Sequence, residues 1–245
     1  MPLSQLPDWF VLPDMPLHCD FTSRVVSLAC ERPWLESKLA GVKMRFMEYV
    51  PGPRTRLAMQ VQIDRSHAPI ILQDHPDLEL LMQKGMLDFD AEKFLENWYY
   101  RFPSLSNEPH PNLALQCEHS ADTQDPVLLY LAVGQMQHSD TQWRKVDAGD
   151  DANWFPGPVE GTDVLPLHGH GSENVMMIRW NKTTVFKTRI DPLGEELLIV
   201  KGAVCDAQGS YPENTWIRNP VEAWQSWGAK AGTVVYYKNG HFAQS

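Results

Sequence analysis

The stretch Gly194-Glu195-Glu196-Leu197-Leu198-Ile199-Val200-Lys201-Gly202 decides the fold, because a short apolar run rich in β-formers lies between two glycines. Turn residues follow it in the order Gly209-Ser210-Tyr211-Pro212. Glycines and turn residues at this spacing favour strands over a helix. We therefore predict an extended segment at residues 193–201 and a turn at residues 209–212.

The same pattern occurs 117 residues earlier as Glu79-Leu80-Leu81-Met82-Gln83-Lys84-Gly85. Further matches in this register are Glu96 with Glu213, Asn97 with Asn214, Arg101 with Arg218, and Pro103 with Pro220. Taken alone, residues 76–84 and 90–100 also fit short capped helices. Two homologous copies must share one fold, however, so the repeat predicts an all-β sandwich or barrel for each copy.

Landmarks on both sides of this register define the domains. Trp34 and Gly41 precede the first copy as Trp154 and Gly161 precede the second, in each case 120 residues earlier. A polar stretch at residues 137–150 separates the copies. We predict two tandem domains, residues 1–140 and 141–245.

Charge and hydropathy restrict the partners. The chain has 245 residues, with 21 Lys and Arg against 31 Asp and Glu, which gives a net charge of −10. This charge repels phosphate backbones and anionic lipids, so we expect neither nucleic acid nor a membrane as a partner. No apolar run approaches the roughly 20 residues needed to cross a bilayer, and no secretory signal precedes Arg24. We expect a cytoplasmic protein.

Three further features have simple structural interpretations. The four cysteines form no Cys-x-x-Cys pair, so we expect mostly buried thiols. His168-Gly169-His170 is expected to be a turn with surface imidazoles, because its spacing identifies no third metal ligand. The tryptophans are expected to fill barrel cores in preference to lining a ligand pocket.

The residues from Gly194 to Pro220, together with Trp154-Phe155-Pro156-Gly157, resemble the core of the ChrR-type cupin domain. This resemblance implies a jelly-roll barrel for each copy, and thus a bicupin. It also implies a divalent metal held by a His-x-His pair, a Glu shortly after the pair, and a later His across the barrel.

In the second copy the matching positions read Arg189, Asp191, Glu195 and Gln225, so one expected ligand type of four remains. We predict that these residues form a ligand pocket that has lost its metal. Strand alternation places Arg189 and Asp191 on one face, and we predict that the Arg189 guanidinium pairs with Asp191 or Glu195 inside the barrel.

In the first copy the matching positions read Leu72, Asp74, Leu78 and Glu108. A set shifted by a residue or two remains open as an alternative, and it consists of Asp74, His75, Glu79 and His110. Carboxylate and imidazole ligands suit Zn, Fe, Ni or Mn.

Two functions follow from the resemblance. The first is a non-catalytic bicupin, regulatory or binding a small ligand, with degenerate metal sites; the chain lacks the zinc-binding helical domain of the ChrR anti-sigma factors. The second is a metal-dependent dioxygenase that acts on a small diketone or aromatic ketone, with its metal in the first barrel. The expected partners are a small molecule or a regulatory protein, and exposed sheet edges make a homodimer a reasonable expectation.

Overall fold

The computed structural model describes residues 6–64, 70–71, 77–89, 92–103, 114–116, 126–186 and 189–242. These residues form strands joined by turns and two short 3-10 helices, η2 (Ala29–Glu31) and η3 (Asp151–Asn153), so the predicted all-β fold is confirmed. Among them, no helix has the length and hydropathy to cross a membrane. The chain divides into two compact units, Met1–Cys19 with Pro33–Gly149 and Asp20–Arg32 with Asp150–Ser245.

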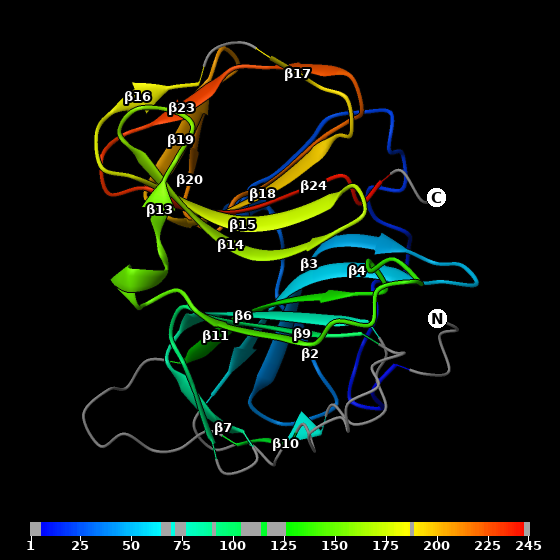
Figure 1. Ribbon diagram of the computed structural model, residues 1–245. Helices are drawn as coiled ribbons and strands as arrows, with labels where there is room; N and C mark the ends of the chain where they lie inside the picture. Colours follow the sequence, from blue (N-terminus) through cyan, green and yellow to red (C-terminus); the bar gives the residue numbers. More distant parts are fainter. Residues whose placement is uncertain are drawn as a thin grey trace. The chain divides into compact units, whose positions relative to one another are not determined.

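The first unit encloses its apolar core between two antiparallel sheets (Figure 1). The larger sheet has the spatial order β12 (Arg144–Asp147), β9 (Trp98–Phe102), β6 (Leu78–Lys84), β11 (Val127–Val133), β4 (Arg56–Ile63), β3 (Val42–Val50) and β2 (Leu35–Glu36). The smaller sheet has the order β5 (Ile70–Ile71), β10 (Ala114–Gln116), β7 (Met86–Phe89) and β8 (Glu92–Leu95).

The second unit repeats this arrangement. Its larger sheet has the order β1 (Val25–Ser27), β21 (Trp216–Asn219), β18 (Glu195–Lys201), β24 (Val234–Asn239), β15 (Glu173–Trp180), β14 (Thr162–His170) and β13 (Phe155–Pro156). Its smaller sheets are β16 (Thr184–Val185), β23 (Trp227–Ala229), β19 (Ala203–Asp206) and β20 (Ser210–Pro212), and the pair β17 (Arg189–Asp191) and β22 (Ala223–Gln225).

The predicted repeat register is confirmed at the strands that defined it. Strands β6 and β18 lie 117 residues apart at both ends. Each is followed by a glycine in the left-handed region, Gly85 at φ 87° and Gly202 at φ 79°. The glycines allow the sharp turn into the smaller sheet, since other residues rarely adopt this conformation.

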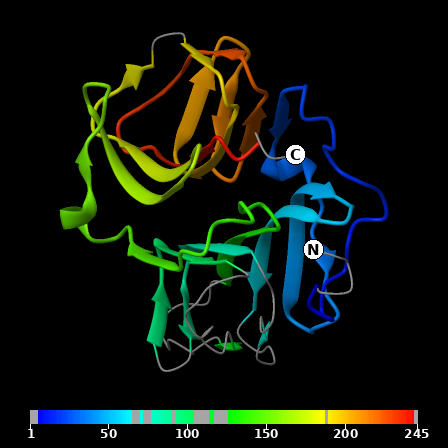
Figure 2. The same cartoon turned by 45° about the vertical axis from the view of Figure 1, so that its right-hand side comes forward.

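The two repeats exchange their first strands. Arg24 and Val26 recur 120 residues later as Arg144 and Val146, so β1 and β12 are equivalent segments. Yet β1, from the first repeat, pairs with β21 of the second unit, and β12 pairs with β9 of the first unit. Figure 2 shows β1, in blue, beside the orange strands of the second unit. Each large sheet therefore contains strands from both repeats.

Buried arginines anchor the exchanged segments. In the first unit Arg101 is fully buried, its Nη2 lies 2.7 Å from Oδ2 of Asp140, and its Nη1 donates to Glu79. Tyr99 also donates to Glu79, at 2.7 Å. Burial and the Glu79 carboxylate raise the pKa of Tyr99 well above its usual value, so the phenol keeps its proton.

The equivalent arginine of the second unit is Arg218. Its Nη2 donates to the carbonyl oxygen of Asp20 at 2.8 Å, and its guanidinium lies 4.3 Å from the ring centre of Phe21. Both residues belong to the exchanged segment Asp20–Arg32. One arginine in each unit thus holds the segment that enters that unit's sheet.

The cysteines differ from the expectation. Cys19, Cys30 and Cys205 are exposed, so the prediction of mostly buried thiols is wrong for these three. Cys19 lies in an irregular segment, Cys30 in the short helix η2 and Cys205 at an exposed position of β19, which the sequence spacing did not reveal. Cys117 lies outside the described residues.

Candidate functional site

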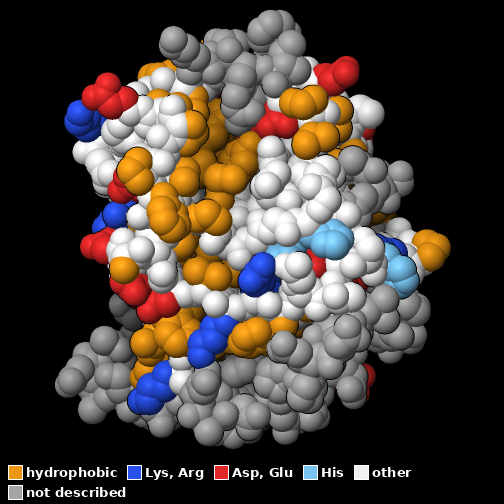
Figure 3. Space-filling view, in the orientation of Figure 1, with side chains coloured by type: hydrophobic (Ala, Val, Ile, Leu, Met, Phe, Trp, Pro, Cys, Tyr) orange, Lys and Arg blue, Asp and Glu red, His pale blue; other side chains and the backbone are white. Residues whose placement is uncertain are grey.

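A pocket of about 730 Å³ opens into the barrel of the second unit. Figure 3 shows hydrophobic side chains gathered over this part of the unit. The lining residues are mainly apolar or aromatic, and they are Pro158, Val159, Glu160, Val164, Met176, Ile178, Thr184, Val185, Phe186, Trp227 and Tyr237. A cavity of this size and lining fits a small organic molecule.

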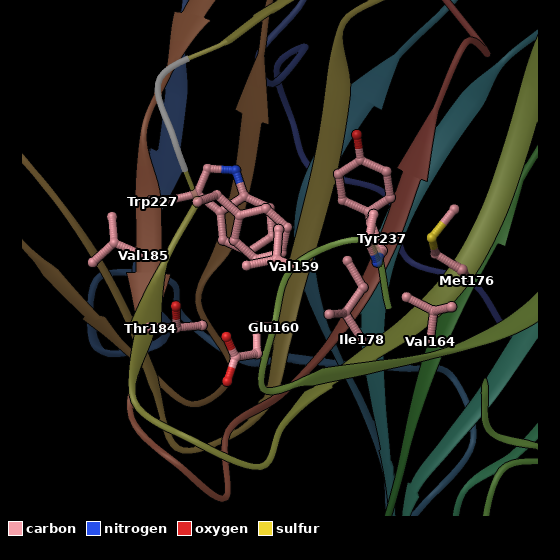
Figure 4. Close-up of a pocket in the computed structure, with 11 residues that line it drawn as sticks. Val159, Glu160, Val164, Met176, Ile178, Thr184, Val185, Trp227 and Tyr237 are labelled. Atoms are coloured by element: carbon pink, nitrogen blue, oxygen red, sulfur yellow. The ribbon is translucent and has the colours of Figure 1, made fainter. Parts of the chain in front are cut away.

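Aromatic rings form one wall of the pocket. Phe186 stacks on Trp227 with ring centres 4.7 Å apart, and Trp180 packs edge-on against Phe186 at 5.6 Å. Tyr237, on β24, is 6.3 Å from Trp227. Figure 4 shows Trp227 and Tyr237 among the residues that line the pocket. These rings come from separate segments of the chain and offer flat surfaces for an apolar body.

Tyr237 links the pocket to a buried carboxylate. Its hydroxyl donates to Oδ2 of Asp191 at 3.1 Å, and the Asn239 amide donates to the same oxygen at 3.4 Å. The other oxygen of Asp191 accepts from the backbone N–H of Leu193 at 3.0 Å. Asp191 is 3% exposed. Tyr237, Asn239 and the backbone of Leu193 thus all donate to this carboxylate.

Glu195 provides a second buried carboxylate. It lies on the same face of β18 as the core residues Leu197 and Ile199, because alternate strand residues share a face. Its Oε1 accepts from Nδ2 of Asn219 at 2.9 Å. The position that resembles the cupin Glu ligand thus contacts an amide.

Arg189 and Gln225 lie directly opposite each other in the β17–β22 pair. Their side chains are outside the described part of the structure. The pairing of Arg189 with Asp191 or Glu195 therefore stays a prediction. What the backbone shows is that the two sequence positions share one antiparallel ladder with Asp191.

The first unit has apolar residues where the second has this polar group. With the repeat offsets of 117 and 106 residues, Glu195 corresponds to Leu78, Asn219 to Phe102, Tyr237 to Leu131 and Asn239 to Val133. All four replacements belong to the apolar core of the first unit and are at most 2% exposed. At these four positions the first barrel carries apolar side chains, whereas the counterpart of Asp191 is Asp74, which lies outside the described residues.

The shifted metal site of the first barrel is only partly described. Asp74, His75 and His110 lie outside the described residues. Glu79 alternates with Leu78 and Leu80 of the apolar core, and its carboxylate accepts from Arg101 and Tyr99 on the opposite face of β6. A metal inside the barrel would have to draw Glu79 away from Arg101, and the set stays a prediction.

A metal also fits poorly in the second barrel. The described side chains there supply carboxylates, amides and a phenol, whereas the family pattern needs imidazoles. Among the described residues, no group of three or more His, Cys, Asp or Glu is arranged to hold a metal ion. We derive no chemistry through a metal.

Two expectations need correction. His168 and His170 end strand β14 and form no turn, and His168 is buried at 6% exposed, because the following turn begins only at Gly171. Trp227 belongs to the core, as expected, but also lines the pocket. Composition cannot separate these roles, since a barrel interior serves as both core and cavity wall.

Comparisons with known proteins agree with this architecture. A family model described as the ChrR Cupin-like domain matches residues 142–243. No curated protein is significantly similar to the chain.

Solved structures similar to the chain cover nearly its whole length. The bacterial pirin YhhW from Escherichia coli, in complex with nickel(II), has a TM-score of 0.62 at 11% identity, with 89% of this chain and 98% of that chain covered. The protein Ylba from E. coli has a TM-score of 0.61 at 8% identity, covering 90% and 91%. The 11S allergen from Cocos nucifera has a TM-score of 0.61 at 8% identity, covering 90% of each chain. At these identities the likeness shows a shared fold.

Proposed function

Residues 142–243 match the ChrR Cupin-like domain, and on this premise we propose that the chain is a non-catalytic bicupin whose second barrel binds a small, largely apolar molecule. The observation that carries the proposal is the pocket between Trp227, Phe186 and Tyr237. Binding there would regulate the chain or a partner protein.

The contrast between the two barrels supports this assignment. The second barrel combines an open apolar pocket with buried polar groups at the positions that resemble cupin ligands. In the first barrel the counterpart of Glu195 is Leu78, and those of Asn219, Tyr237 and Asn239 are also side chains of the apolar core. One barrel would therefore serve as the binding site and the other as its structural partner.

Blocking the pocket tests the proposal. Met176 lines it and is partly exposed, so Met176→Trp should fill part of the cavity. We expect the dissociation constant of a neutral fluorescent probe, N-phenyl-1-naphthylamine, to rise at least about tenfold, because the bulkier ring removes apolar contact area. Probe fluorescence in a titration gives the constant.

The matched control is Met15→Trp. Met15 is 75% exposed and does not line the pocket, so the same substitution there should leave probe affinity unchanged. Equal affinities for the Met176→Trp variant and the original chain would place the probe elsewhere and contradict the proposal.

Metal content separates this function from the alternative dioxygenase. We expect protein purified without a histidine tag to contain well under one transition metal ion per chain, and a chelator to leave probe affinity unchanged, because the described donors of the second barrel bind one another. Elemental analysis gives the metal content. A near-stoichiometric metal would favour the dioxygenase, and loss of that metal in a His75→Ala variant would place it in the first barrel.

A further inference from the structure

The N-terminal segment of the chain contributes two aromatic side chains to the core of the first unit. Trp9 and Phe10 are 7% and 6% exposed, their ring centres lie 4.3 Å apart, and both belong to the apolar core of this unit. The carbonyl oxygen of Trp9 accepts from the backbone N–H of Lys38 at 3.1 Å. The aromatic pair therefore enters the core beside the loop that joins β2 to β3.

The repeat relates this part of the first unit to the pocket of the second. At offsets of 120 and 117 residues, Leu39, Met44, Met59 and Val61 correspond to four pocket residues, which are Val159, Val164, Met176 and Ile178 (Figure 4). Met44, Met59 and Val61 are at most 1% exposed and share a core with the aromatic pair, and Leu39 packs against that core. In the second unit Val164 and Met176 are partly exposed. Equivalent positions are thus covered in the first unit and accessible in the second.

The residues that would supply such a segment to the second unit serve elsewhere. Residues 126–137 lie 120 positions after residues 6–17, and they contain β11, which pairs with β4 and β6 in the first unit. The loop N–H of Lys38 is also lost, because the equivalent residue is Pro158 and proline has no backbone N–H. An occupant of the pocket therefore has to bind through its side chains.

Charge at the pocket rim restricts the occupant further. In the first unit Asp8 precedes the aromatic pair, and the loop reads Lys38-Leu39-Ala40. In the second unit the loop reads Pro158-Val159-Glu160, so a positive charge is lost and a negative one is gained. Glu160 pairs with Lys182 at 2.9 Å, but both side chains are exposed and such pairs are weak. Complementarity therefore favours a neutral or basic residue where the first unit has Asp8.

We propose that the pocket binds a partner protein through a short segment with two consecutive aromatic residues, preceded by a neutral or basic residue. The inference rests on the binding function proposed above, since it uses the same pocket and names its partner. The volume of about 730 Å³ suits two aromatic side chains, and Phe186 and Trp227 offer them ring faces. The chain's own pair, Trp9 and Phe10, is buried in the first unit, so a second copy does not supply the segment.

Three peptides with blocked ends test the chemistry of the segment. The first has the sequence of residues 6–12 with Asp8→Lys, the second keeps Asp8, and the third combines Asp8→Lys with Trp9→Ala and Phe10→Ala. Isothermal titration calorimetry with the full-length chain gives each dissociation constant. We expect the first peptide to bind about two- to fivefold more tightly than the second, because of the rim charge. It should bind at least about tenfold more tightly than the third, because alanine removes most of the apolar contact area.

The Met176→Trp variant tests the location. It should weaken binding of the first peptide at least about tenfold, since the larger ring takes up space in the pocket. Met15→Trp is the matched control and should leave the affinity unchanged, because Met15 is 75% exposed and does not line the pocket. Should Met176→Trp not fold, Val159→Asn replaces it, because Val159 lines the pocket from the loop between β13 and β14.

Each outcome decides a different point. If N-phenyl-1-naphthylamine binds the pocket but no peptide does, the binding function stands and the partner inference is overturned. If neither binds, the proposed function fails as well. Equal affinities of the first and third peptides would overturn the aromatic requirement, and equal affinities of the first and second would overturn the charge requirement. Unchanged affinity in Met176→Trp would put the peptide outside the pocket and contradict the proposal. A dimer of the chain in light scattering that the first peptide dissociates would make a second copy the occupant and overturn the assignment to a partner protein.

Discussion

Replacing Arg101 by Ala is expected to lower the free energy of unfolding by about 3–5 kcal/mol. The guanidinium is fully buried and contacts the carboxylates of both Glu79 and Asp140. Alanine would leave these two carboxylates buried without their cation. It would also release the segment that leads into β12, so the large sheet of the first unit would lose the anchor of its edge strand.

Chemical denaturation followed by tryptophan fluorescence measures this loss. Arg144→Ala is the control, because Arg144 lies on β12 itself but is exposed and donates to Gln142. Its removal should change the free energy of unfolding by less than about 0.5 kcal/mol. If both variants unfold at the same denaturant concentration, Arg101 does not anchor the exchanged segment.

The Gly240→Ala variant should lose at least about 3 kcal/mol of stability. Gly240 has φ 76°, and a Cβ atom there would lie 1.9 Å from the carbonyl oxygen of Ser172. The left-handed conformation alone costs a residue other than glycine about 1–2 kcal/mol. Because the clash is with backbone, relieving it must also displace the chain between β14 and β15.

Gly232→Ala separates the two contributions. Gly232 has φ 86°, but a Cβ there would meet no atom within 4 Å, so only the conformational cost of about 1–2 kcal/mol applies. Thermal unfolding of the two variants should differ clearly in midpoint. Equal midpoints would mean that the Ser172 carbonyl moves aside at no cost. The repeat supplies a second test, since Gly134 has φ 68° and the same close approach, 2.1 Å, to the Thr55 oxygen.

The sequence predicts the strands well because the repeat resolves their ambiguity. Residues 78–84 fit a capped helix when taken alone, and only the match to residues 195–201 identifies them as a strand. The exchange of β1 and β12 is different. Both segments are recognisable as equivalents at an offset of 120, but local pattern contains nothing about which barrel a strand joins. That choice depends on long-range pairing.

The candidate site was predictable in part. Family positions led to Asp191 and Glu195, which are buried in the second unit but do not line the pocket, so their role in a ligand pocket stays a prediction. Phe186, Trp227 and Tyr237 were missed as pocket residues, since Phe186 follows β16, Trp227 lies on β23 and Tyr237 on β24, and the three meet only when the barrel forms. The family position predicts the apolar side chain at Leu78 in the first barrel. The matches of Leu131 and Val133 to Tyr237 and Asn239 are found only with the second repeat offset of 106 residues.

Because of the exchanged strands, the two large sheets are completed at different stages of protein synthesis. Strand β12 is made about 40 residues after its partner β9, so the large sheet of the first unit is complete soon after residue 147 emerges. Strand β1 is made about 190 residues before its partner β21. At about 5–20 residues per second, β1 spends roughly 10–40 s without its native neighbour. The second unit thus depends on a segment made at the start of synthesis. If another part of the chain or another protein bound residues 25–27 in that interval, the large sheet of the second unit would lack its edge strand β1.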